Sequence, residues 1–264
     1  MKNTYINQFE NLTVSHKIDE QAIMNDEFKE HFHTFFEILY FISGDLDYVI
    51  ENKRFKMSPF DIVIMKPTEH HFIDFHSNSQ YERYVLKFSE RYIPQNLLSI
   101  IKNMDSHFSI PDGEIPKLFQ KFDDYNENYS DASLQNLNSA TLVELFVFLS
   151  LLNSKQSLSP TVVNESMIEI LEYINNNLSV DLSLDALSQK FYRSKIWLYR
   201  AFKESLHTCP NEYITAKRIA LARDLLANGY RPTQIFEQCG YQDYSTFYRQ
   251  YKKLCGTSPK KNDE

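Results

Sequence analysis

The sequence has no apolar segment long enough to cross a membrane as a helix. A membrane-spanning helix needs roughly 20 mainly apolar residues, and the most apolar stretch, Leu142 to Leu152, is about half as long and contains Glu144. The first residues also lack the apolar core and small-residue cleavage site of a secretory signal. We therefore expect a cytoplasmic protein with no membrane partner.

Cysteine is scarce, with three residues in the whole chain. Cys209, Cys239 and Cys255 show none of the short spacings of a zinc site, and an odd number does not suit a set of disulfides. We expect them to be small buried apolar side chains. The sequence thus favours neither a disulfide-stabilised secreted domain nor a cysteine-ligated metal centre.

The chain does have enough apolar residues for two folded cores. Of its 264 residues 42% are hydrophobic and 14% aromatic, and domains typically span roughly 100 to 150 residues. The net charge of -7 is uneven, at -9 for residues 1–163 and +2 for residues 164–264. Phosphate contacts depend on where Lys and Arg cluster rather than on total charge. An acidic half followed by a mildly basic half is consistent with a sensor domain joined to a DNA-binding domain.

Short apolar runs separated by turn residues fill the region from 35 to 89. Six of them, rich in Phe, Tyr, Ile and Val, are expected to be strands: FFEILYFI, LDYVI, RFKM, FDIVIM, HFIDF and YVLKF. Successive short strands without helices between them predict an antiparallel barrel or jelly roll. After Tyr92 the apolar spacing becomes helical around 95–104, 116–128 and 134–152.

The last of these helical segments is apolar on more than one side from Leu142 onward. Two interpretations stay open, because the helix can pack entirely on its own barrel or form part of a seam between two copies of the chain. The polar segment NSKQSLSP that follows is expected to be a linker. The predicted organisation is a barrel domain at 1–152, a linker at 153–163 and a second domain at 164–264.

The C-terminal part contains an internal repeat with an offset of 49 residues. LYRAFK at 198–203 aligns with FYRQYK at 247–252, and the same offset aligns Leu187 with Phe236, Gln189 with Gln238 and Tyr192 with Tyr241. A shared offset over such a length indicates two related modules.

Each copy has the pattern of a helix-turn-helix. In the first, a short helix over 184–191 and a turn precede Ser194, the expected N-cap of a helix that reaches Leu206. In the second, Pro232 begins a helix through Cys239, Gly240 breaks it, and the next helix covers about 244–254. A long helix over 211–227 is expected to fix the distance between the modules.

The second helix of each module is predicted to bind double-stranded DNA. Apolar residues four apart face the core and turn their neighbours toward solvent. The solvent-facing residues are Lys195, Ile196, Tyr199, Arg200 and Lys203 in the first copy and Tyr244, Ser245, Tyr248, Arg249 and Lys252 in the second. Arg can pair with guanine, Tyr and Ser with phosphate or base edges, and Ile with the thymine methyl. Ordinary helical hairpins with charged outer faces are the alternative.

A larger set of positions in this region carries a family resemblance. It includes LSLDAL at 182–187, Ser194 to Lys203, PNEYI at 210–214, Gly240 to Phe247 and GTSP at 256–259. Together these resemble the AraC/XylS-type regulator domain over about residues 164–260. The resemblance implies two helix-turn-helix units that both contact DNA, through Ile196, Tyr199 and Arg200 and through Tyr244, Ser245, Tyr248 and Arg249. Phe236 and His207 depart from the family pattern, which has alanine and glycine there.

The N-terminal part resembles a second family pattern. His31-Phe32-His33, with Glu37 and Gly44 after it, is similar to the first metal motif of cupin barrels, and Pro67 with His70 and His71 lies in the region of the second. Two imidazoles and a carboxylate can bind Fe(II) or Mn(II). Sensor domains of the AraC type resemble cupins and often keep this motif without a metal, so no metal or other cofactor is expected.

The resemblance predicts instead a pocket for a small-molecule effector inside the barrel. Its expected lining is His31, His33, Glu37, Tyr40, Tyr48 and His70. Strand histidines near the rim with a packing role only are the alternative for His31 and His33.

The predicted fold class is α+β with two domains, a cupin-like antiparallel β-barrel with following helices and an all-α double helix-turn-helix domain. We expect a sequence-specific transcription regulator, an activator rather than a repressor, that responds to a sugar or related metabolite. A homodimer and a contact with RNA polymerase are the expected protein partners, and no enzymatic activity is expected. Two alternatives remain: a metal-dependent cupin enzyme with a helical association domain, and a DNA-binding protein with an inert barrel.

Overall fold

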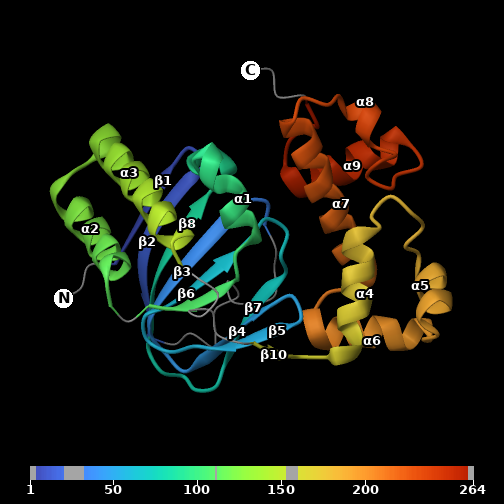
Figure 1. Ribbon diagram of the computed structural model, residues 1–264, viewed down its shortest axis with the longest axis horizontal. Helices are drawn as coiled ribbons and strands as arrows, with labels where there is room; N and C mark the ends of the chain where they lie inside the picture. The colour runs from blue at the N-terminus through green and yellow to red at the C-terminus, as the bar shows by residue number, and fades with distance from the viewer. Residues whose placement is uncertain (1–3, 21–32, 111, 153–159, 261–264) are drawn as a thin grey trace. The chain divides into compact units, whose positions relative to one another are not determined.

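The computed structural model describes residues 4–20, 33–110, 112–152 and 160–260. The chain divides into two compact units, Met1–Thr161 and Val162–Glu264 (Figure 1). Antiparallel strands and helices build the first unit, and helices build the second. In the described part of the chain no helix is long and apolar enough to cross a membrane.

Two sheets form the centre of the first unit. Their strands are β1 (Tyr5–Phe9), β2 (Leu12–Asp19), β3 (Phe36–Ser43), β4 (Leu46–Ile50), β5 (Lys53–Lys56), β6 (Asp61–Met65), β7 (His71–Phe75), β8 (Tyr81–Phe88), β9 (His107–Ser109) and the two-residue β10 (Thr161–Val162). The larger sheet has the order β1-β2-β8-β3-β6-β9 and the smaller one the order β10-β5-β4-β7. All six predicted strands are present, which confirms the predicted antiparallel domain.

Strand β3 shows how the larger sheet uses its two faces. Successive side chains of a strand point to opposite faces, and accordingly Ile38 and Tyr40 pack in one core while Leu39 and Phe41 pack in another. The first core lies against helices and the second lies between the two sheets. Glu37 shares the inner face with Leu39, so a buried carboxylate lies among apolar side chains.

Helices cover the outer face of the larger sheet (Figure 1). They are α1 (Gln95–Asn103), α2 (Glu114–Asn128) and α3 (Asp131–Ser150), preceded by the short 3-10 helix η3 (Glu90–Tyr92). One side of α3 is buried through Leu142, Leu145 and Phe146, whereas Val143 and Val147 on another side are 38% and 45% exposed. The packing of α3 on its own domain therefore leaves an apolar strip uncovered within the chain.

The second unit contains two small cores joined by one long helix. Its helices are α4 (Glu165–Asn176), α5 (Leu184–Phe191), α6 (Lys195–Leu206), α7 (Pro210–Ala227), α8 (Pro232–Ile235) and α9 (Tyr244–Cys255). Tyr213 and Ile214 of α7 pack with α4, α5 and α6, and Ile219 and Ala222 further along α7 pack with α8 and α9. The predicted connecting helix is thus confirmed. The helix predicted from Pro232 to Cys239 is shorter, because residues 236–240 continue it only as turns.

The offset of 49 residues between the modules holds after each turn. Ser194 and Asp243 are the N-caps of α6 and α9, and each cap begins a helix of 12 residues. Before the turn the offset is 48, because the left-handed residue that ends the preceding helical segment is Tyr192 in the first module and Gly240 in the second. The second turn therefore contains one residue more than the first.

This extra residue changes which residues correspond to each other in the first helices of the two modules. Leu187 corresponds to Ile235, and both side chains are buried, at 1% and 0% exposure. Tyr192 is 94% exposed, whereas Tyr241 is 8% exposed. The predicted matches of Leu187 with Phe236, Gln189 with Gln238 and Tyr192 with Tyr241 are wrong by one residue, because an alignment without a gap cannot represent an insertion in the turn.

Candidate DNA-binding and effector sites

Helices α6 and α9 are each anchored by an N-cap and by two core side chains. Ser194 Oγ accepts a hydrogen bond from the Trp197 backbone N–H at 3.1 Å, and Asp243 Oδ1 accepts one from the Thr246 backbone N–H at 2.8 Å. Such caps satisfy N–H groups that have no partner inside the helix. The inward-facing pairs, listed by module, are Leu198 with Phe202 and Phe247 with Tyr251, and all four are buried as predicted.

In the first module the five predicted DNA-contacting residues are all exposed: Lys195, Ile196, Tyr199, Arg200 and Lys203. Ile196 is 67% and Tyr199 47% exposed, which leaves both side chains accessible to a ligand. The Lys195 ammonium pairs with Asp185 of α5 at 2.5 Å. Helix α6 therefore offers a mixed apolar and cationic face.

Sequence reasoning missed three residues at the border of this face. Tyr192 lies in the turn with a left-handed backbone and a fully exposed ring. The Arg193 guanidinium lies over the ring of Trp197 at 4.7 Å. The signal available in the sequence was the single tryptophan of the chain, because it lies among residues that were predicted to face solvent.

The second module departs from the prediction at two tyrosines. Ser245, Arg249 and Lys252 are exposed, but Tyr244 and Tyr248 are half-buried. The Tyr244 ring packs edge-on against Phe236 at 6.1 Å and lies 5.9 Å from Phe247 of the core. Tyr244 therefore leans on the module rather than facing solvent freely, because Phe236, large where the resembling family has alanine, provides an aromatic surface for it.

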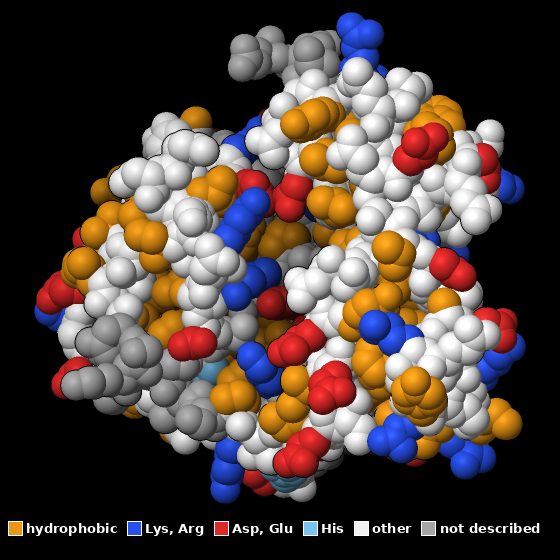
Figure 2. All heavy atoms as spheres, turned by 45° about the vertical axis from the view of Figure 1, so that its right-hand side comes forward, with side chains coloured by type: hydrophobic (Ala, Val, Ile, Leu, Met, Phe, Trp, Pro, Cys, Tyr) orange, Lys and Arg blue, Asp and Glu red, His pale blue; other side chains and the backbone are white. Residues whose placement is uncertain are grey.

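Matched positions nevertheless recur on the two helices. Arg200 and Arg249 are each the sixth residue of a 12-residue helix, and Lys203 and Lys252 are each the ninth. All four are exposed. On the face drawn in Figure 2, Lys and Arg side chains are interspersed with Asp and Glu, so the surface is not uniformly basic.

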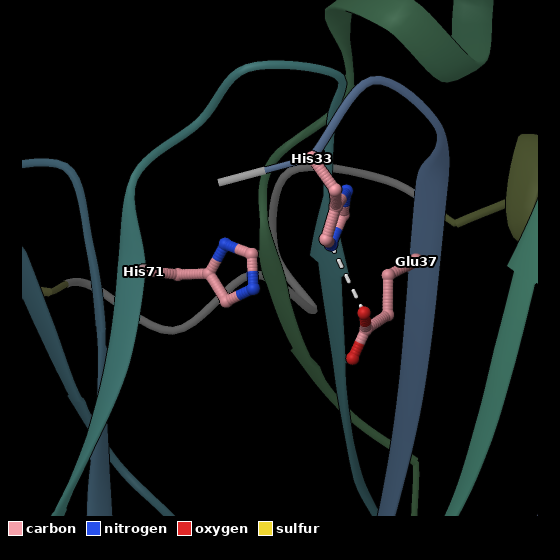
Figure 3. Close-up of side chains that lie close together, drawn as sticks. All are labelled: His33, Glu37 and His71. Carbon is pink, nitrogen blue, oxygen red and sulfur yellow. Dashed lines mark hydrogen bonds and ion pairs between the residues drawn. The ribbon is translucent and has the colours of Figure 1, made fainter. Parts of the chain in front are cut away.

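A different group of side chains converges inside the first unit (Figure 3). Glu37 lies at the start of β3, His33 lies three residues before that strand, and His71 begins β7, which belongs to the other sheet. The His33 Nε2 atom lies 3.0 Å from Glu37 Oε2, and the rings of His33 and His71 are 4.9 Å apart. All three are nearly buried, at 9%, 6% and 2% exposure.

Backbone carbonyls orient both imidazoles. His33 Nδ1 lies 2.9 Å from the Phe35 carbonyl oxygen, and His71 Nδ1 lies 2.9 Å from that of Glu69. A carbonyl oxygen only accepts, so Nδ1 is the donor in both rings. The Nε2 atoms are consequently the ones that serve the site, as a donor when the ring is charged or through a lone pair when it is neutral.

Glu37 is held in its ionised form. Burial alone would raise the pKa of Glu37, but the hydrogen bond with His33 and the charge interactions with Lys87, His33 and His71 outweigh it and hold the pKa well below its usual range. Lys87 lies opposite Glu37 in the register of β3 and β8, and its Nζ is 3.4 Å from Glu37 Oε2. The site therefore contains a buried carboxylate that is paired with the ammonium of Lys87.

Tyr48 lies on the same inner surface. It is 4% exposed and belongs to the core between the two sheets, together with Tyr81. Burial, the neighbouring Tyr81 and the negative charge of Glu37 raise the pKa of Tyr48 well above its usual value. Tyr48 is thus a neutral phenol, able to donate or accept a hydrogen bond.

Two predicted pocket residues lie elsewhere, and one cannot be placed. Tyr40 is three residues from Glu37, so strand alternation turns it to the other face, where its ring stacks on Phe119 of α2 at 4.3 Å. His70 is buried outside the group, since alternation in β7 directs His71 toward Glu37. His31 lies outside the described residues.

The three converging residues form a set that can ligate a divalent metal. Two imidazoles and one carboxylate are the ligands of many Fe(II) sites, and a carbonyl on the second ring nitrogen is the usual way to orient such histidines. Their ligand atoms all lie within 4.8 Å of one another. Ligands about 2.1 Å from one ion lie roughly 3 to 3.5 Å apart, so the side chains would have to close slightly around it.

Comparisons with known proteins define both domains. Residues 19–131 match the family model of the AraC-like ligand binding domain, and residues 187–262 match that of a helix-turn-helix domain. The HTH-type transcriptional activator RhaS of Escherichia coli is 21% identical over 272 residues, covering 94% of this chain and 96% of RhaS. The probable transcriptional regulator LumQ of Photobacterium leiognathi is 26% identical over 156 residues, covering 59% of this chain and 61% of LumQ.

Among solved structures, ToxT from Vibrio cholerae aligns over 95% of this chain and 97% of its own length, with 16% identity and a TM-score of 0.40.

A ligand-binding sheet domain followed by two helix-turn-helix modules defines a ligand-regulated DNA-binding protein. Most of the chain is covered by the two family matches, which occur in the order of the predicted domains. The chain belongs to the AraC family of transcription regulators. DNA and a small-molecule effector are therefore its partners.

Proposed function

We propose that this protein is a transcription activator that places α6 and α9 in successive major grooves of one DNA site. The observation that carries the proposal is the pair of exposed arginines, Arg200 and Arg249, at the same position of two equally long, equally capped helices. Major grooves on one face of DNA recur about every 34 Å, so a ligand with that repeat suits a repeated surface. The relation to RhaS, an activator, supports activation over repression.

In this proposal Lys195, Ile196, Tyr199, Arg200 and Lys203 of α6 and Tyr244, Ser245, Tyr248, Arg249 and Lys252 of α9 are the DNA-binding residues. Arginine supplies base readout and lysine supplies phosphate contacts. The half-buried Tyr244 and Tyr248 are assigned to the backbone of the DNA, since a tyrosine hydroxyl can form a hydrogen bond with a phosphate.

The same proposal covers the cellular role. A sensing and dimerisation domain at 1–152, a linker at 153–163 and a DNA-binding domain at 164–264 act in the cytoplasm as a homodimer that contacts RNA polymerase. The division of the chain between residues 161 and 162 supports this organisation, and the exposed strip on α3 supports dimerisation. Regulators among the relatives support a role without enzymatic activity.

Selection of bound DNA from a random pool, with and without a panel of sugars and related metabolites, tests the proposal. We expect one enriched sequence whose affinity changes in the presence of one metabolite. Enrichment of no sequence, or binding that varies only with total charge and salt, would overturn it.

The effector is proposed to bind between the two sheets, beside His33, Glu37, Tyr48 and His71. Buried hydrogen-bonding groups in an apolar surround are how such domains fix a small polar molecule. A metabolite at 100 times its dissociation constant should stabilise the protein by about 2.7 kcal/mol. The matched variants are His71→Ala, which removes a member of the group, and His70→Ala, which removes its buried neighbour in the chain.

A second candidate for the effector is a divalent metal ion, favoured by the convergence of His33, Glu37 and His71 within 4.8 Å. Titration calorimetry with Fe(II), Mn(II) and Zn(II) distinguishes the two candidates. Metal binding that His71→Ala abolishes and His70→Ala keeps would assign a metal, and stabilisation by a metabolite after chelation would assign an organic effector. Metal-dependent turnover of a metabolite would instead support the alternative of a cupin enzyme.

A further inference from the structure

The two helix-turn-helix modules meet at Arg218, midway along α7. The residue lies between Ile214, which belongs to the core of the first module, and Ile219, which belongs to the core of the second. The Arg218 Nε donates a hydrogen bond to the Leu178 carbonyl at 3.0 Å, and its Nη2 donates one to the Val180 carbonyl at 2.8 Å. Both carbonyls belong to the loop after α4, so the guanidinium is fixed on the first module.

The turn of the second module packs directly on this arrangement. Gly240 has a φ of +77°, and a Cβ built there would lie 2.1 Å from the Leu178 carbonyl oxygen and 2.6 Å from Arg218 Nε and Nη2. No real side chain tolerates such distances to a backbone oxygen. The backbone of the second turn therefore touches both the loop of the first module and the arginine that holds it.

A third contact involves Tyr241, next to Gly240 in the chain. The guanidinium carbon of Arg218 lies 5.8 Å from the centre of the Tyr241 ring, within the range of a cation–π interaction. Tyr241 is 8% exposed and packs in the core of the second module with Phe247 of α9. Arg218 thus contacts a core residue that also supports the recognition helix of that module.

We propose that the junction of Arg218 and Gly240 fixes the angle between α6 and α9 and thereby selects the separation of the two DNA half-sites that the protein accepts. Helix α7 alone sets a distance, but each module could still tilt on its end of that helix. Because α9 begins four residues after Gly240, a small rotation of the turn moves the whole of α9. One added base pair shifts a half-site by about 3.4 Å along the DNA axis, so a fixed junction discriminates between spacings.

This inference rests on the proposed binding of two successive grooves. The test uses the full chain, the site selected from the random pool, and two derivatives of that site with one base pair inserted or deleted between the half-sites. We expect the parent protein to prefer the selected spacing by about tenfold or more, the usual scale for a site with one wrong position. Arg218→Met keeps a long unbranched side chain but removes the guanidinium and its hydrogen bonds to the loop, and we expect most of this preference to disappear.

Lys217→Met is the matched control. Lys217 is the neighbour of Arg218 on α7, and its ammonium lies over Tyr213 within the first module at 5.1 Å. A lost phosphate contact or a smaller folded fraction weakens binding to every spacing alike, so the ratio of affinities stays at the parental value. Gly240→Ala should reduce the ratio as Arg218→Met does. Since this variant can fail to fold, Arg218→Met decides the outcome.

The possible results separate the two proposals. A parental spacing preference in Arg218→Met, or an equal loss of preference in Lys217→Met, would overturn the role of the junction while leaving two-groove binding intact. A selected site without two half-sites would overturn the proposed function, and this inference with it.

Discussion

At the residue scale, Arg200 and Arg249 are the side chains that should carry sequence readout. Both are exposed on helices whose opposite faces are buried. We expect Arg200→Ala and Arg249→Ala each to cost about 1 to 3 kcal/mol of binding free energy at the selected site, as for the loss of a bidentate base contact. Lys203→Ala should weaken binding to all sequences similarly and reduce the dependence on salt. Fluorescence anisotropy over a range of salt concentrations measures both effects.

Identical binding by the three variants and the parent protein would remove the proposed recognition faces. Asn176→Ala, at an exposed and uncharged position of α4 outside these faces, serves as the control.

A buried histidine predicts a pH dependence in the sensor domain. His16 of β2 is 1% exposed, with Nε2 3.0 Å from Glu82 and Nδ1 3.2 Å from Asp123 of α2. Burial alone would lower the pKa of His16, but hydrogen bonds and charge interactions with Asp123 and Glu82 outweigh it and raise the pKa above its usual 6.5. The charged imidazole therefore ties α2 to the sheet.

Because the folded pKa is raised, the stabilisation by charged His16 is complete below its usual pKa and is lost as pH rises through the raised value. His16→Gln keeps hydrogen bonding without the charge. We expect the parent to exceed this variant in free energy of unfolding by more at about pH 6 than at about pH 9. Urea denaturation at both values measures the difference, and a difference that stays constant or grows with pH would show that the imidazole is not charged in the folded state.

At the scale of elements, the caps of the recognition helices are open to a direct test. Ser194→Ala removes the acceptor for the Trp197 N–H and should reduce stability by about 0.5 to 2 kcal/mol, whereas Ser194→Asp should keep the cap. Urea denaturation followed by Trp197 fluorescence reports on this module, since the chain has a single tryptophan. Equal stability of Ser194→Ala and the parent would mean that solvent replaces the cap.

Helix α3 provides the test of dimerisation. Val143 and Val147 are four residues apart on its exposed side, as expected for one edge of a helix–helix contact. Val147→Glu should shift the protein from dimer to monomer in sedimentation equilibrium. Ile100→Glu, at the similarly exposed Ile100 of α1, should not. A parent protein that is monomeric at all concentrations would refute dimerisation through α3.

The sequence sufficed for elements whose apolar pattern is strong. The strands from β3 to β8 and the long helices follow from alternation and helical spacing. Strands β1 and β2 were missed because YINQF and LTVSHKID mix polar and apolar residues, and β9 because three residues are too few for a pattern. Residues 12–19 form the strand β2 because they pair with β8. The local sequence gives no signal for pairing between segments that lie far apart in the chain.

The converging group of side chains was only partly predictable for the same reason. Of the residues predicted to line an effector pocket, His33 and Glu37 lie together and Tyr48 lies on the same inner surface, whereas Tyr40 faces the other core and His71, not His70, joins the group. In each case one residue of strand register decides which face a side chain takes, and the sequence pattern leaves that register open. The sequence comparison did not detect the extra residue in the turn of the second module, because that residue lies between two segments that each align well.

At the scale of the whole molecule, the two units have separate cores and separate tasks. An effector can change DNA binding only if it binds two arrangements of the protein with different affinity. In the proposed account the buried polar group of the first unit binds the effector, and the second unit presents two recognition helices joined by the long helix α7. The central claim is that these two helices enter consecutive major grooves.

Methylation protection of guanine N7, an atom in the major groove, tests this claim most directly on the selected DNA site. We predict two protected clusters about 10 to 10.5 base pairs apart, one lost in Arg200→Ala and the other in Arg249→Ala. Protection confined to one groove, or a pattern that neither substitution changes, would contradict the account.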